Sequence, residues 1–291
     1  MNSDEEQHYQ ELSSYSSGKQ RDNDMRDIAV AVTLYNNEKE IIGFAGSLLK
    51  QSIADRIQLL VTCNACKDPE SFRKELLEVL PSALVFEPGK NLGYLNGCLY
   101  GVKECGQDFS WVMVSNTDIE FKETDFFEKL TGKVRDDIWC ISPDIVLSAT
   151  GVHQNPFLSE RPSKKKIMIW KTAFSNRFLY RLYFKLSDLK PRKPQRGSLK
   201  SRYVYAVHGS CFMFRKECVE KILPVCNNIF MYGEELLVAE IVRQNGKKAF
   251  FNASVGIIHN ENQVTGTIGM DRKQKWFKNS FRYLTANYFN K

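Results

Sequence analysis

Short apolar runs alternate with amphipathic segments along the first half of the chain. Four runs are apolar throughout, the pattern of strands buried on both faces: 28–37, which ends in two asparagines, 57–61, 83–86 and 111–114. Three segments between them carry apolar residues at helical spacing: 38–51, 69–80 and 95–105. Strands that alternate with helices of about 10–15 residues are typical of a mainly parallel sheet with right-handed crossovers. The pattern therefore predicts a doubly wound α/β fold.

The second half continues with elements that carry polar residues at or near their ends. We expect a strand, a helix and a final strand: 204–215, 230–246 and 248–258. The first contains His208, the helix opens with Glu234 and Glu235, and the last strand ends at His259. Adjacent carboxylates at a helix N-terminus are stabilised by the helix dipole, so they indicate either a functional pair or ordinary capping acids. A histidine at a strand end is open to a structural interpretation as well.

Residues 157–200 interrupt this pattern with a basic and aromatic segment. Twelve Lys/Arg and one acidic residue fall between 164 and 200, a local charge of +11 in a chain of formal charge +7, so the rest sums to −4. Cations interleaved with aromatic residues suit a helix or helical hairpin on an anionic membrane surface. The alternative is a solvated basic insert packed on its own domain. The charge alone also fits nucleic-acid binding, but no recognised nucleic-acid motif accompanies it, so we expect no nucleic-acid partner.

The two ends of the chain differ in character. Residues 1–26 are polar and nearly free of aliphatic residues, which predicts a disordered lead-in before a domain over 27–262. Residues 263–291 repeat the basic and aromatic character of the insert and are predicted to form a closing helix.

Composition and cysteine usage favour an ordinary globular domain in a reducing compartment. The chain has 291 residues, of which 43% are hydrophobic and 26% charged, enough to bury a large core. Among the eight cysteines, Cys63 and Cys66 are closest in sequence, and no histidine follows at the spacing of a zinc site. No uninterrupted apolar stretch reaches about 18 residues and no signal peptide opens the chain, so we expect a cytoplasmic protein.

The segment 109–121 places a carboxylate where a buried strand runs out. Its apolar run ends in Ser115-Asn116-Thr117-Asp118. In open α/β sheets, ligands bind in the crevice outside the carboxyl ends of the strands. Asp118 is therefore a candidate for binding a metal or a diphosphate. The alternative is that Asp118 caps a turn or the helix that starts near Thr124.

A glycine-rich segment follows the third predicted strand. Gly89, Gly93 and Gly97 allow tight turns and close backbone approach, and they lie before or within a helix start, where N–H groups favour an anion. The segment does not have the dinucleotide-binding spacing of glycines. A plain connection between strand and helix is the alternative interpretation.

Taken in order, these features resemble a known family. Its motifs match six places in the chain: Val32-Thr33-Leu34-Tyr35-Asn36, Asn91-Leu92-Gly93-Tyr94-Leu95-Asn96-Gly97, Asn116-Thr117-Asp118, His208-Gly209-Ser210, Tyr232-Gly233-Glu234-Glu235 with Arg243 and Gly246, and His259. Over roughly 27–262 the chain resembles the nucleotide-sugar-dependent glycosyltransferases of family 2, which have the GT-A fold. It is most similar to their rhamnosyl- and galactofuranosyltransferase-like branch.

The resemblance implies an inverting transfer of a sugar from a nucleotide diphosphate to a hydroxyl of a glycan acceptor. Asp118 and His259 would hold Mn²⁺ or Mg²⁺, which neutralises the leaving diphosphate. Glu235 would be the base that removes the acceptor proton, with Glu234 as the second choice. With the basic insert, the expected acceptor is lipid-linked, in surface polysaccharide synthesis, and the expected location is the inner face of the cell membrane.

The resemblance also implies two sets of binding residues. The expected donor-binding residues are Thr33, Tyr35, Asn36, Cys63, Asn64, Asn91, Gly93, Asn96 and Asn116. The expected acceptor-side residues are His208, Gly209 and Tyr232. Cys63 stands where the family usually has an aspartate that contacts the nucleobase, so Asn64 or Asp68 would take part of that role. Glu235 stands where the family more often has an aspartate.

Two other functions remain open. A nucleotidyltransferase that makes nucleotide sugars would have a glycine-rich signature bearing Lys or Arg near the first strand, where this chain has Leu34-Tyr35-Asn36-Asn37-Glu38. A non-catalytic protein that binds sugar nucleotides or membranes is the other alternative, and the cysteine at position 63 motivates it.

Overall fold

The computed structural model describes residues 26–188, 199–261 and 269–289. The predicted lead-in, apart from Arg26, lies outside the described residues. So do 189–198 of the basic insert and 263–268 and 290–291 of the C-terminal segment.

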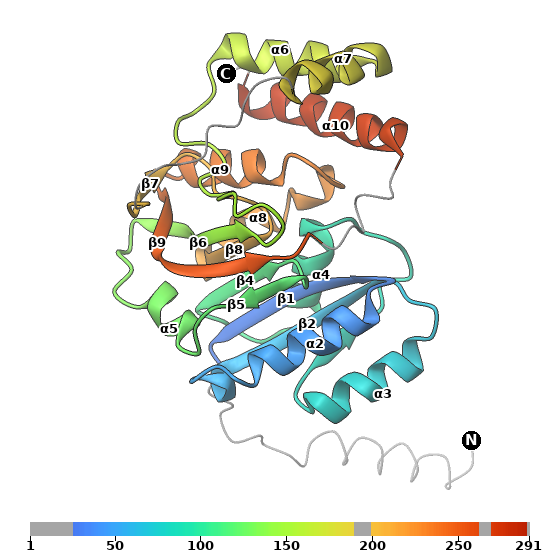
Figure 1. Cartoon of the computed structure of the whole chain (residues 1–291), viewed down its shortest axis with the longest axis vertical. Coiled ribbons are helices and arrows are strands. Elements are labelled where there is room, and N and C mark those ends of the chain that lie inside the picture. The colour runs from blue at the N-terminus through green and yellow to red at the C-terminus, as the bar shows by residue number, and fades with distance from the viewer. Residues whose placement is uncertain (1–25, 189–198, 262–268, 290–291) are drawn as a thin grey trace, which may run out of the picture.

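One sheet of nine strands organises the chain, as Figure 1 shows. Its parallel half runs in the spatial order β3-β2-β1-β4: Leu84–Phe86, Ile57–Ala65, Ile28–Tyr35 and Trp111–Ser115. The order continues through β8, β6, β9 and β5: Cys211–Arg215, Ile138–Leu147, Lys248–His259 and Ile119–Phe121. β7 (Arg202–Val204) pairs with β9. The reversal of strand order beside β1 confirms the predicted doubly wound, mainly parallel sheet.

Helices cover both faces of this sheet. One face carries α2, α3 and α5: Glu38–Leu48, Pro69–Val79 and Phe126–Thr131. The other carries α4, α8 and α9: Leu95–Cys105, Lys216–Ile222 and Glu234–Gln244. Two short 3-10 turns lie in the connections: η1 (Ala54–Arg56) between α2 and β2, and η2 (Cys226–Asn228) between α8 and α9. Alternate residues of β1 enter the two cores, Ala29 and Ala31 one of them and Val30 and Val32 the other, so the strand is buried on both faces from Ile28 to Val32. This explains its unbroken apolar run.

The predicted strand over 204–215 is two strands. β7 pairs with β9, whereas β8 lies between β4 and β6. The connection between them contacts a distant segment, because Ala206 forms an isolated bridge with Leu158. Apolar residues lie on both sides of the short segment His208-Gly209-Ser210, so the sequence alone predicts one strand.

The basic insert forms the predicted helical hairpin, and the predicted closing helix is present. α6 (Lys164–Ser175), α7 (Arg177–Asp188) and α10 (Met270–Leu284) pack together at one end of the molecule in Figure 1, and a π-helical turn, η3 (Thr285–Phe289), follows. Phe174 is the centre of their contact, with ring centroids 4.8 Å from those of both Phe277 and Phe281. The inner face of the hairpin is therefore packed on α10. Among the described residues, no helix combines the length and apolar character needed to cross a bilayer.

A buried ion-pair network ties this helical layer to the sheet. The carboxylate of Glu240 in α9 is fully buried and accepts hydrogen bonds from Arg161 at 2.7 Å, Arg243 at 2.8 Å and the hydroxyl of Tyr205 at 2.6 Å. Burial opposes ionisation, but these donors outweigh it and hold the pKa of Glu240 below its usual value. Arg161 also donates to the carbonyl of Tyr288 at 3.1 Å. The network thus joins the start of the insert, α9 and the C-terminal turn.

Candidate active site

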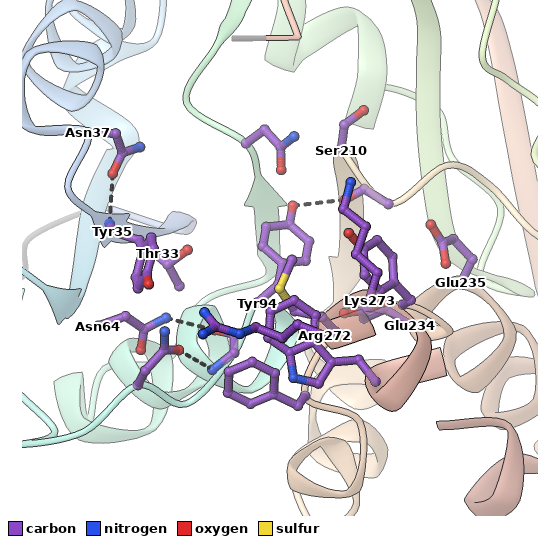
Figure 2. Close-up of a pocket in the computed structure, with 18 of the residues that line it drawn as sticks. Thr33, Tyr35, Asn37, Asn64, Tyr94, Ser210, Glu234, Glu235, Arg272 and Lys273 are labelled. Carbon is purple, nitrogen blue, oxygen red and sulfur yellow. Dashed lines mark hydrogen bonds between the residues drawn. The ribbon is translucent and has the colours of Figure 1, made fainter. Parts of the chain in front are cut away.

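A cavity of about 1120 Å³ opens at the carboxyl ends of β1, β2, β4 and β9. This is the crevice where ligands bind in doubly wound sheets. Figure 2 shows that polar side chains enter it from both sides, with Thr33, Tyr35 and Asn64 on one side and Glu234 and Glu235 on the other.

Most of the residues expected from the sequence line this one cavity. They are Thr33, Tyr35, Asn64, Asn91, Gly93, Asn116, Asp118, His208, Gly209, Tyr232, Glu234, Glu235 and His259. Three expected residues are not in its lining: Asn36, Cys63 and Asn96. Asn36 has a positive φ of 55° and donates its backbone N–H to Ala65. The Asn96 amide donates to the carbonyl of Leu92 and accepts from the thiol of Cys226, which gives it a structural role.

The Cys63 thiol is half-buried at the end of β2. It interacts with the thiol of Cys66, and burial raises its pKa to about 11. The thiol is therefore protonated near neutral pH. A neutral thiol accepts hydrogen bonds from a nucleobase only weakly, unlike the carboxylate the family usually has at this place.

Asp118 and His259 lie together at the end of the sheet. Nε2 of His259 is 3.2 Å from Oδ1 of Asp118 and 3.2 Å from Nδ2 of Asn116. Nδ1 of His259 is 2.7 Å from Oε1 of Gln154, an oxygen that can only accept, so Nδ1 carries the proton. When His259 is neutral, the lone pair of Nε2 lies beside a carboxylate, an arrangement that a shared cation stabilises.

The donor set of this pair fits Mn²⁺ or Mg²⁺ with two protein ligands. Within the described ranges there is no cluster of three His, Cys, Asp or Glu side chains that could hold a metal. An oxygen-rich site with few protein ligands is completed by substrate phosphates and water, which is typical of Mg²⁺ and its analogues. Asp118 and His259 are therefore able to contribute to a metal site without forming one alone.

Glu234 and Glu235 are the first residues of α9. They lie on the side of the cavity opposite Thr33, Tyr35 and Asn64 in Figure 2. The chain enters this helix through Tyr232 and Gly233, both at positive φ. Glu234 is only 5% exposed, and its burial together with the adjacent Glu235 raises its pKa to about 8. Glu235 is partly accessible, yet burial raises its pKa too, against hydrogen bonds from the backbone N–H groups of Gly209 and Gly233. Both carboxyl groups accept backbone hydrogen bonds that favour their charged forms, and burial raises both pKa values, so the two adjacent groups titrate as a coupled pair.

The segment 208–210 positions Glu235. The hydroxyl of Tyr94 donates to the carbonyl of Gly209 at 2.8 Å, and the backbone N–H of His208 donates to Oδ1 of Asn155 at 2.7 Å. A Cβ at position 209 would lie 2.8 Å from Oε1 of Glu235, so only glycine leaves room for this carboxylate. Burial and the nearby His259 lower the pKa of His208 to about 4, which keeps its imidazole neutral.

Close packing requires two of the three glycines in the glycine-rich segment, Gly93 and Gly97. Gly93 has φ of 82°, and a Cβ there would lie 2.0 Å from the carbonyl oxygen of Phe230. The side-chain amide of Asn64 donates to Gly93 O at 2.8 Å and accepts from Leu92 N at 2.9 Å. A Cβ at Gly97 would lie 2.7 Å from Cγ2 of Thr33. The predicted close backbone approach is thus present, and Asn64 fixes the loop that makes it.

The sequence interpretation missed one wall of the cavity. Helix α10 contributes cations and an aromatic ring to the lining: Arg272, Lys273, Lys275 and Trp276. Figure 2 shows Arg272 and Lys273 between the two polar sides. The basic and aromatic composition of 263–291 is the available signal, but composition alone does not show that the closing helix faces the site. Arg177, the first residue of α7, also lines the cavity.

No protein-family model and no curated protein matches this sequence, whereas solved structures match its fold. One is mannosyltransferase PcManGT from Pyrobaculum calidifontis in complex with GDP-Man and Mn²⁺, at 12% identity and a TM-score of 0.54, covering 95% of this chain and 76% of that one. Another is GalNAc-T7 with UDP, GalNAc and Mn²⁺, at 13% identity and a TM-score of 0.59, covering 90% of this chain and 48% of that one. This chain therefore spans about half the length of GalNAc-T7. At such identities the likeness shows the fold, and this chain has the GT-A fold.

Gly93→Ala should destabilise the protein far more than Gly89→Ala. Both glycines have a positive φ, 82° and 72°, so each substitution costs about 1–2 kcal/mol of backbone strain. Only position 93 adds a clash, worth about 1–3 kcal/mol more, because nothing lies within 4 Å of a Cβ at position 89. Urea unfolding measures the loss of stability in both variants. Equal losses would show that the contact with Phe230 is not as close as described.

Glu234→Gln should stabilise the protein in alkaline but not in acidic solution. Because the native pKa of Glu234 is raised to about 8, the native state binds more protons than the unfolded state between about pH 4.5 and 8, so stability falls as pH rises through this window. Glutamine removes this loss, on the order of 3 kcal/mol at pH 9 and close to zero at pH 4.5. Thermal unfolding at both pH values measures it. Glu70→Gln, exposed in the first turn of α3, is the control. A pH-independent difference for Glu234→Gln would contradict the raised pKa.

Proposed function

We propose that this chain is an inverting glycosyltransferase that moves a sugar from a nucleotide diphosphate to an acceptor hydroxyl. One observation carries the proposal: a single cavity on a GT-A fold is lined both by the Asp118–His259 pair and by the Glu234–Glu235 pair. The first pair suits a cation and a diphosphate, and the second suits proton removal. Both are what a direct displacement at a sugar carbon needs.

The donor is proposed to bind with its diphosphate toward Asp118 and His259. These two residues would hold Mn²⁺ or Mg²⁺, which supplies Lewis-acid stabilisation of the leaving diphosphate when bound. Arg272, Lys273 and Lys275 add positive charge to the same cavity, so part of the diphosphate charge is balanced by the protein itself. Thr33, Tyr35 and Asn64 lie on the β1–β2 side, where the nucleoside is proposed to sit.

Glu235 is the proposed base. Glu234 is more deeply buried, which favours its protonated form, whereas Glu235 is partly accessible from the cavity and accepts hydrogen bonds from the backbone of Gly209 and Gly233. The Glu235 carboxylate takes the proton of the acceptor hydroxyl as that oxygen attacks the anomeric carbon. Its raised pKa brings its basicity closer to what proton abstraction at neutral pH requires. Attack on the face opposite the leaving group inverts the anomeric centre.

The solved neighbours support the donor class. PcManGT is in complex with GDP-Man and Mn²⁺, and GalNAc-T7 with UDP, GalNAc and Mn²⁺. The motifs given above favour the rhamnosyl- and galactofuranosyltransferase-like branch. A lipid-linked acceptor in surface polysaccharide synthesis, at the inner face of the cell membrane, is proposed from the same resemblance and from the basic hairpin beside the cavity.

Glu235→Gln should abolish turnover while it leaves donor binding intact. Loss of a general base lowers kcat by about 10²- to 10⁴-fold. The KM for the donor should stay within a few-fold, since Glu235 does not contact the diphosphate in this account. Release of nucleoside diphosphate from a panel of GDP- and UDP-sugars, with glycan acceptors, measures both constants. A smaller loss in Glu234→Gln than in Glu235→Gln assigns the base to Glu235.

A smaller loss of turnover in Glu235→Gln than in Glu234→Gln assigns the base to Glu234. If both single variants keep full turnover, neither glutamate is the base. A wild-type protein that binds donor but turns over none of the panel would favour the non-catalytic alternative.

A further inference from the structure

An apolar stripe runs along the outer face of α7. Phe178, Leu182 and Leu186 follow one another at intervals of four residues, and they are 74%, 40% and 53% exposed. At this spacing they lie on one side of the helix. Tyr180 and Phe184 point the other way, into the contact with Phe277 of α10. The hairpin thus has a packed inner face and a second apolar face that is exposed to solvent.

The helix before it has a similar outer surface. Met168 and Ile169 of α6 are 52% and 50% exposed, whereas Ile167 and Phe174 are buried. The two helices are held as one unit, because the indole N–H of Trp170 donates to the hydroxyl of Tyr183 at 2.8 Å. Of the eleven large apolar side chains exposed on the described surface, five lie on this hairpin: Met168, Ile169, Phe178, Leu182 and Leu186. Such concentration marks an interaction surface rather than scattered exposure.

The charge around this surface selects one class of partner. Seven cations and a single acid occupy 164–188: Lys164, Lys165, Lys166, Lys171, Arg177, Arg181, Lys185 and Asp188. Asp271 of α10 pairs with Arg177 at 3.0 Å and Arg181 at 3.5 Å, which leaves the lysines as the main outward charge. Exposed apolar residues flanked by lysines match a bilayer with anionic headgroups, which takes the apolar groups below the headgroups and attracts the cations.

We propose that the α6–α7 hairpin docks on an anionic lipid bilayer through Phe178, Leu182 and Leu186 and the surrounding lysines. Arg177 lines the cavity and Phe178 follows it directly, so the docked surface borders the cavity mouth. Figure 1 places the hairpin at the opposite end of the molecule from α2 and α3, so those helices face away from the bilayer. Membrane binding is measured without donor or acceptor, so it is tested independently of sugar transfer.

Co-sedimentation with vesicles tests the docking. The full chain should bind vesicles that contain phosphatidylglycerol, bind pure phosphatidylcholine weakly, and lose binding as salt is raised. Leu182→Ser with Leu186→Ser should weaken binding on the order of tenfold or more. The matched control is Leu49→Ser with Leu77→Ser, two leucines that are 48% and 37% exposed at the α2–α3 end. This control should bind as the wild type does.

A second variant tests the charges and does not touch an apolar residue. Lys164→Gln with Lys165→Gln should weaken binding to anionic vesicles and leave the melting temperature unchanged. No binding of the wild type to anionic vesicles, or equal binding by both leucine pairs, overturns the proposal. A dimer that the Leu182/Leu186 variant dissociates would assign the stripe to a second copy. Retention of RNA in preference to vesicles would assign it to nucleic acid. Either of these results also overturns the proposal.

Discussion

The backbone contact between Gly93 and Phe230 is the constraint on which the cavity depends. It joins the loop after β3 to the segment that leads into α9, since Tyr94 N–H donates to Phe230 O at 3.1 Å. From there, the Tyr94 hydroxyl holds Gly209, and Gly209 lies against Glu235. The position of the proposed base is thus set by contacts that start on the proposed donor side. A shift at Gly93 would move both sides of the cavity together.

Carboxylates and cations line the same cavity. Asp118 with His259 and the adjacent Glu234 and Glu235 contribute two groups of titratable side chains to its lining. Cations from α10 line the same cavity, and Figure 2 shows Arg272 and Lys273 between Asn64 and Glu235. Because α10 also packs against the hairpin, the same helix contacts both the candidate site and the proposed membrane surface. This arrangement offers a physical route by which docking on a bilayer could influence the site.

The sequence predicted what local periodicity and strand ends determine. Helix α4 has the predicted bounds 95–105, Asp118 follows the end of β4, and His259 is the last residue of β9, next to Asp118. What it missed depends on contacts between distant segments. The break between β7 and β8 arises from pairing with different partners. The cations of α10 reach the cavity because the helix packs on the hairpin and on the segment before α9, where Phe277 stacks on Tyr232, and such tertiary contacts have no local pattern.

The most direct test of the central claim is a thermal-shift measurement with nucleoside diphosphates. We expect GDP or UDP to raise the melting temperature of the wild type, and Mn²⁺ to increase that shift, because a ligand that binds only the native state stabilises it. Asp118→Ala should lose the Mn²⁺-dependent part, whereas the exposed control Asp55→Ala should keep it. A shift that is the same with and without Mn²⁺, or the same in Asp118→Ala, would contradict the proposed metal and diphosphate site.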